Sequence, residues 1–131
     1  MGYRILIVED SPTMRQLVVF ALRTMPDLQI TEAVDGLDGL KKVRGCAFDL
    51  AIVDINMPLM DGLKLVSLLR SDPKSKRIPI VIVSTEGNSE TKRRAEALGV
   101  NAYLTKPIVS GHVFKTVKAL LEGDDGAGCR P

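Results

Sequence analysis

The chain has 131 residues, of which 45% are hydrophobic and 4% are aromatic, and it contains no tryptophan. This length suits one domain with an aliphatic core, which needs neither a disulfide nor a structural metal to fold. The 18 basic and 16 acidic residues leave a net charge of +2. That balance argues against a nucleic-acid-binding protein, because such proteins carry a larger and clustered basic excess.

The cysteines and the apolar runs indicate the cellular compartment of the protein. Cys46 and Cys129 lack the spacing of a metal site, and no apolar run has the form of a signal peptide or a membrane span. We therefore expect a reduced, soluble protein of the cytoplasm without membrane contact. A single domain is expected over residues 3–122. Residues 123–131 are rich in glycine and aspartate and have no apolar face, which predicts a flexible C-terminal tail.

The first apolar run, Ile5–Val8, predicts a buried strand that stops at Glu9. Ser11 and Pro12 then suit the N-cap and the first position of a helix. Apolar residues recur at helical spacing as far as Met25, so we predict a helix after this strand.

The segment Gln29–Val34 is more polar and predicts a strand at the edge of a sheet. A short helix follows, with apolar residues at positions 37, 40 and 43, and it closes near Gly45. Leu50–Val53 is a third apolar strand, which ends at Asp54.

A loop at residues 56–58 precedes a helix that opens at Asp61 and Gly62. Ile78–Val83 predicts the fourth strand, which ends at Ser84. A polar stretch then leads into a helix that ends at Gly99, a residue typical of C-caps.

The last elements are a strand at Ala102–Thr105, the pair Lys106 and Pro107, and a helix to about Leu121. Strict alternation of strands and helices predicts an α/β fold with a parallel sheet and helices on both faces. The strands are continuous apolar runs, as burial on both faces requires. Five units of this size favour an open, doubly wound five-stranded sheet over a closed barrel.

Polar residues follow four of the predicted strands. The carboxyl ends of parallel strands share one edge, where ligands bind. Glu9 and Asp10, Asp54, Ser84 and Lys106 should therefore meet there. Each residue alone fits a solvated loop or a helix cap, but the set indicates a site. Three close carboxylates repel one another, and Mg²⁺, which prefers oxygen ligands, would relieve that repulsion.

This set of groups suits phosphoryl transfer. A carboxylate can act as a nucleophile and become an acyl phosphate. The charge on the transferred group could be neutralised by the metal, by Lys106 and by the hydroxyl of Ser84. Asp54 lies between these groups and is the candidate acceptor.

Four segments, in this order, resemble the receiver domains of two-component signalling, and in particular the single-domain chemotaxis regulators of the CheY type. They are Ile7–Ser11, Val53–Gly62, Val83–Thr85 and Tyr103–Pro107. The similarity extends from about Tyr3 to Leu121. It implies a flavodoxin-like and CheY-like sheet with strand order 2-1-3-4-5, an order taken from the family.

The resemblance also implies a metal site. Asp54 is the phosphoacceptor, and Asp10 and Asp54 bind Mg²⁺ directly, together with the backbone carbonyl of Asn56. Glu9, in place of the commoner aspartate, acts mainly through water. Lys106 contacts the phosphoryl group, and its peptide bond to Pro107 is expected to be cis.

The same resemblance implies a switch. Ser84 is the switch hydroxyl, where threonine is also frequent, and Tyr103 is the aromatic residue that moves between outward and buried positions. Ile108 stands where phenylalanine is often found. None of these departures removes a group that the chemistry needs.

The function that follows is a phosphorylation-activated response regulator. It would take its phosphoryl group from a sensor histidine kinase and assist its own phosphorylation and autodephosphorylation without being an enzyme. It would signal, in a chemotaxis-like role, through a target protein at the face of the fourth helix, fifth strand and fifth helix, with Lys92, Arg93 and Lys115 as candidate contacts. The alternatives are a phosphorelay intermediate, a phosphate sink, or a receiver domain truncated from a larger regulator.

Two rival classes share part of the pattern. A flavodoxin-like FMN protein needs a hydroxyl-rich loop after the first strand, where Glu9 and Asp10 would repel phosphate. An aspartyl-phosphate phosphatase needs a second carboxylate two residues after its nucleophile, and Asn56 stands there instead. The basic residues near positions 70–77 and 92–94 are expected to be solvated surface, with no nucleic-acid partner.

Overall fold

Five parallel strands form one sheet in the order β2-β1-β3-β4-β5. Their bounds are β1 Tyr3–Val8, β2 Leu28–Ala33, β3 Leu50–Asp54, β4 Ile80–Ser84 and β5 Ala102–Thr105. The computed structural model describes residues 2–122, so the tail predicted over residues 123–131 lies outside the described residues. The strand order confirms the doubly wound sheet, and β2 lies at an edge as its polar sequence predicted.

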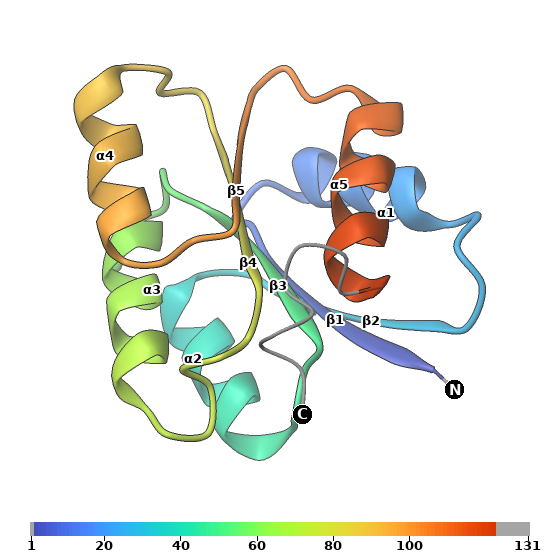
Figure 1. The fold of residues 1–131 in the computed structure, drawn as a ribbon, viewed down its shortest axis with the longest axis horizontal. Coiled ribbons are helices and arrows are strands. Elements are labelled where there is room, and N and C mark those ends of the chain that lie inside the picture. Colours follow the sequence, from blue (N-terminus) through green and yellow to red (C-terminus); the bar gives the residue numbers. More distant parts are fainter. Residues whose placement is uncertain (1, 123–131) are drawn as a thin grey trace.

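Within residues 2–122, five helices connect and follow the strands. Their bounds are α1 Pro12–Leu22, α2 Gly36–Gly45, α3 Gly62–Ser71, α4 Ser89–Ala97 and α5 Ser110–Glu122. Helices α2, α3 and α4 cover one face of the sheet, and α1 and α5 pack beside each other on the other face (Figure 1). This two-sided cover confirms the predicted α/β class.

None of the helices in the described part of the chain is long and apolar enough to cross a membrane.

The central strands are buried on both faces because alternate side chains point to opposite sides of the sheet. Leu6 and Val8 belong to the apolar cluster under α2, α3 and α4. Ile5 and Ile7 belong to the cluster under α1 and α5. All four side chains are fully buried, and full burial of one such side chain contributes about 1.5–3 kcal/mol. Two-sided burial explains why these strands are continuous apolar runs.

Several predicted boundaries differ from the structure: β1 begins two residues earlier than predicted, β2 is shifted by one residue, and two further differences have a clear cause in hydrogen bonding. The fourth strand begins at Ile80 and not at Ile78, because Pro79 has no N–H to donate and the Ile78 N–H donates to the Ser75 carbonyl in a turn. Helix α1 ends at Leu22, three residues before Met25, whose N–H donates to the Leu22 carbonyl.

Arg70 is not the solvated surface residue that its sequence context predicted. Its guanidinium is half-buried and donates to backbone carbonyls of two loops, at 2.7 Å to Ile78 and 2.6 Å to Gly99. Further bonds reach Lys76 and Leu98. Because a guanidinium has five N–H donors in a fixed plane, one side chain can hold several carbonyls at once. Arg70 therefore joins the α3–β4 loop to the end of α4.

The start of α3 lies directly against the end of β3. Asp61 caps α3, since its Oδ1 accepts a hydrogen bond of 2.8 Å from the Lys64 N–H. The Gly62 N–H donates to the Ile55 carbonyl at 2.9 Å. A Cβ atom on Gly62 would lie 2.3 Å from the carbonyl oxygen of Asp54. Only glycine allows the two backbone segments to approach so closely.

We expect Gly62→Ala to lower the free energy of unfolding by about 2 kcal/mol, because overpacking costs about 1–3 kcal/mol and this clash is with backbone. Gly45→Ala is the matched control, since a Cβ there would meet no atom within 4 Å. The control should be neutral or stabilising by up to about 1 kcal/mol. Urea denaturation measures both. Equal effects of the two substitutions would contradict this account of the β3–α3 junction.

Candidate functional site

The strand ends place polar side chains along one edge of the sheet. Asp54 ends β3, Ser84 ends β4, Glu9 follows β1 and Lys106 follows β5. The Lys106 N–H donates to the Ser84 carbonyl at 2.7 Å, which joins the ends of β4 and β5. The Lys106–Pro107 peptide bond is cis, as predicted.

One ammonium group contacts two buried carboxylates at this edge. Lys106 Nζ lies 3.2 Å from Asp54 Oδ1 and 3.3 Å from Glu9 Oε1. Asp54 is only 2% exposed and Glu9 only 3%. Their other contacts come from neutral backbone groups: the Asn56 N–H donates to Asp54 Oδ1 at 3.4 Å, and the Ser11 N–H donates to Glu9 Oε2 at 3.2 Å. Within residues 2–122, the two carboxylates therefore share one cation, Lys106.

Burial and the neighbouring Asp54 carboxylate change the titration of Glu9. Burial, followed by the negative charge of Asp54, raises the pKa of Glu9 from 4.5 to about 7. The hydrogen bond from the Ser11 N–H and the charge of Lys106 act in the opposite direction but do not cancel this effect.

Asp10 completes an all-oxygen cluster with Glu9 and Asp54. One carboxylate oxygen of each residue lies within 4.8 Å of the other two, and the Asp10 side chain is exposed. Hard divalent cations prefer oxygen ligands and keep waters on their open side. The donor set, its excess negative charge and its exposed Asp10 therefore fit such a cation.

Ser84 and Tyr103 are connected through Glu86. The Ser84 side chain is fully buried, and its Oγ accepts a hydrogen bond of 2.9 Å from the Glu86 N–H. The Tyr103 hydroxyl donates to the Glu86 carbonyl. Lys92 Nζ lies 5.6 Å from the centre of the Tyr103 ring. The two residues predicted to form the switch thus contact one intermediate residue, which the sequence reasoning did not single out.

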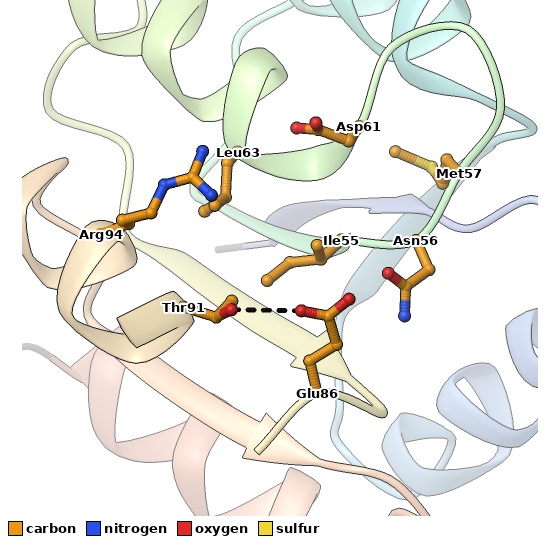
Figure 2. A pocket seen from close by; sticks show the side chains of 8 residues that line it. All are labelled: Ile55, Asn56, Met57, Asp61, Leu63, Glu86, Thr91 and Arg94. Atoms are coloured by element: carbon orange, nitrogen blue, oxygen red, sulfur yellow. Dashed lines mark hydrogen bonds between the residues drawn. The ribbon is translucent and has the colours of Figure 1, made fainter. Parts of the chain in front are cut away.

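A cavity of about 210 Å³ opens beside this network, between the β3–α3 loop and the start of α4 (Figure 2). Asn56, which lines the cavity, donates from Nδ2 to Thr85 Oγ1 at 2.9 Å, which ties the β3–α3 loop to the β4–α4 loop. The cavity is lined by Ile55, Asn56, Met57, Asp61, Leu63, Glu86, Thr91 and Arg94.

Arg15 is a further residue of this edge that sequence reasoning missed. Its Nη1 donates to the Glu9 carbonyl at 2.8 Å, and its Nε forms an ion pair with Glu32 at 3.0 Å. An arginine early in a helix has no local signal that distinguishes it from ordinary surface. Its role follows only from the pairing of β1 with β2, which brings Glu32 near Glu9.

We expect the raised pKa of Glu9 to make the metal-free protein less stable as the pH rises. The native state keeps a proton that the unfolded chain releases above about pH 4.5, so stability falls from there and the loss is complete above about pH 7. Glu9→Gln should remove this loss and be more stable than wild type by on the order of 1 kcal/mol at alkaline pH, after a discount for solvent screening. Urea denaturation with a chelator at several pH values measures it. A difference that does not change with pH would show that Glu9 titrates normally.

Comparisons with known proteins show the family of the chain. The sequence matches the family model of the response regulator receiver domain over residues 5–118. Chemotaxis protein CheY-3 of Vibrio cholerae is 34% identical over 119 residues, which are 91% of this chain and 92% of that protein. Chemotaxis protein CheY of Pseudomonas aeruginosa is 32% identical over 123 residues, which are 94% and 99% of the two chains.

The fold is also that of solved relatives. The structure of chemotaxis protein CheY4 of Vibrio cholerae superposes with a TM-score of 0.85 at 32% identity, covering 92% of this chain and 99% of that one. The family match, the sequence relatives and the strand order agree. The chain therefore belongs to the response regulator receiver domains and is a signalling domain similar to the CheY chemotaxis proteins.

Proposed function

We propose that Asp54 accepts a phosphoryl group from a sensor histidine kinase and that the phosphorylated domain signals by binding a downstream target protein, in a chemotaxis-like role. The observation that carries this proposal is the ion pair between Lys106 and the buried Asp54 carboxylate, 3.2 Å apart at the carboxyl edge of the sheet. A phosphoryl group on Asp54 adds negative charge and acceptor oxygens beside that ammonium group.

The chemistry needs little beyond positioning and neutralisation of charge. A carboxylate oxygen of Asp54 forms a bond to phosphorus, while the bond from phosphorus to the donor histidine nitrogen breaks and the ring keeps its electron pair. Lys106 Nζ donates to a phosphoryl oxygen, and the Ser84 hydroxyl donates to another. The same groups serve water when it hydrolyses the acyl phosphate, so the domain would assist its own phosphorylation and autodephosphorylation.

Magnesium is the cation that we assign to the acidic cluster. Asp10 and Asp54 would bind it directly with the backbone carbonyl of Asn56, and Glu9 would act through water. A bound Mg²⁺ supplies positive charge to the phosphoryl oxygens. Support comes from the response regulator Rcp1, which is 28% identical, has a TM-score of 0.78 and was solved in a manganese-bound form; the two chains are covered to 96% and 94%.

The output follows from the contacts of Ser84. If its hydroxyl turns toward a phosphoryl group, the bond from the Glu86 N–H is lost, and the Tyr103 ring is free to move inward behind it. The surface that changes is the face of α4, β5 and α5. Arg93 of α4 and Lys115 of α5 are exposed there, and Lys92 stacks on Tyr103. These three basic side chains are the proposed contacts of the target.

We expect Asp54→Asn to abolish phosphorylation by acetyl phosphate, because the amide keeps the shape of the side chain but is not a nucleophile. Intact-protein mass and release of the label by hydroxylamine identify the acyl phosphate in wild type. Asp49→Asn is the control, since Asp49 lies at the opposite end of β3. A hydroxylamine-stable label retained on Asp54→Asn would place the acceptor elsewhere.

We expect Asp10→Ala, or an excess of chelator, to lower the rate of labelling by acetyl phosphate about tenfold or more. The circular dichroism spectrum of the variant should be that of wild type. The fold should survive because Asp10 is exposed and its loss relieves like-charge repulsion. Glu96→Ala, which removes an exposed acid on α4, should label normally. Undiminished labelling in chelator would rule out a metal-dependent reaction.

A further inference from the structure

Helix α4 is attached to the domain by different means at its two ends. Of its nine residues, Thr91 and Ala95 are buried. Apolar burial is the main force that holds a helix on a domain. With so little of it, the position of α4 depends on the polar contacts at its ends.

The C-terminal end of α4 is held by Arg70. The guanidinium donates to the Leu98 carbonyl at 3.3 Å and to the Gly99 carbonyl at 2.6 Å. Asn101 strengthens the same junction, since its Oδ1 accepts from the Ile80 N–H at 2.9 Å and its own N–H donates to the Ile80 carbonyl at 2.7 Å. None of these bonds involves a residue of the phosphorylation site, so this end stays fixed when the site changes.

The N-terminal end of α4 is tied to the site itself. Thr91 Oγ1 donates to the Glu86 carboxylate at 3.1 Å (Figure 2). The Glu86 N–H donates to Ser84 Oγ at 2.9 Å, and the Glu86 carbonyl accepts from the Tyr103 hydroxyl. One residue of the β4–α4 loop therefore contacts the switch hydroxyl, the switch aromatic and the buried threonine of α4.

We propose that Glu86 is a positioning residue that couples Ser84 to the first turn of α4, so that α4 pivots about its Arg70-held end when Ser84 turns toward a phosphoryl group. This inference rests on the proposed function and adds to it the part that moves. When Ser84 Oγ leaves the Glu86 N–H, Glu86 loses one of the two side-chain bonds to its backbone, and the Tyr103 bond to its carbonyl changes as the ring moves inward. The Glu86 carboxylate is then no longer held under Thr91. The first turn of α4 then keeps its Asn88 N-cap but loses its link to the site, whereas the last turn keeps its bonds to Arg70.

The test compares amide hydrogen exchange in the first turn, residues 89–92, with that in residues 95–99. Wild type is measured with and without beryllofluoride, a phosphoryl mimic, in the presence of Mg²⁺. We expect exchange to rise about fivefold in the first turn, the factor that one net side-chain hydrogen bond is worth. Exchange at residues 95–99 should be unchanged.

Thr91→Val removes the hydroxyl and keeps the volume, so its first turn should exchange fast already and respond little to the mimic. Thr91→Ser restores the donor and should behave as wild type, a rescue that a merely structural role for Thr91 would not produce. Arg70→Lys keeps the charge but loses the planar set of donors. In that variant the response to the mimic should extend into residues 95–99.

Two results would overturn the inference. One is a wild-type-sized response in Thr91→Val, and the other is a labelled wild type whose α4 exchange does not change. Acetyl phosphate labelling of the same samples distinguishes a failure of this inference from a failure of the proposed function. If wild type is not labelled at Asp54, the proposed function fails, and the inference fails with it. If labelling is normal in every variant but exchange in the first turn does not depend on the Thr91 hydroxyl, only the proposed coupling through Glu86 is wrong and the proposed function stands.

Discussion

Glu9 and Asp54 share the ammonium group of Lys106 because β1, β3 and β5 are parallel and their carboxyl ends lie at one edge. Two buried carboxylates 3.2 and 3.3 Å from one Nζ, with Asp10 nearby, leave that edge short of positive charge. Burial and, after it, the negative charge of Asp54 raise the pKa of Glu9. The excess of negative charge also makes the edge fit a divalent cation. The same shortage makes the edge receptive to charge-neutralising groups, at the expense of stability in their absence.

Features with a local signal could be predicted from the sequence. Ser11 accepts from the Met14 N–H at 3.3 Å as the N-cap of α1, and Pro12 begins that helix. The carboxylates, the lysine and the serine could be placed at one edge because strand direction alone decides where parallel strands end. Strand order was taken from family resemblance, since apolar runs of similar composition do not reveal which strands are neighbours.

Features that depend on distant parts of the chain could not be predicted. Arg70 looks like any basic residue at the end of an amphipathic helix, and its acceptors lie up to 31 residues away. Glu86 is an ordinary loop acid until β5 brings the Tyr103 hydroxyl to its carbonyl. Leu37 has helical spacing with Leu40 and Val43, yet it is 54% exposed, because spacing along a helix does not reveal which of its residues the neighbouring elements cover.

The position of Tyr103 gives the domain an optical probe of its own. The chain has two tyrosines and no tryptophan. Tyr3 begins β1, at the end of the sheet opposite the acidic cluster, whereas Tyr103 donates to Glu86 and lies under the Lys92 ammonium group. A nearby cation and a hydrogen bond both perturb the absorption and emission of a phenol ring. Changes in tyrosine fluorescence that accompany events at the cluster therefore originate from Tyr103, and their rates are measurable on the unlabelled protein.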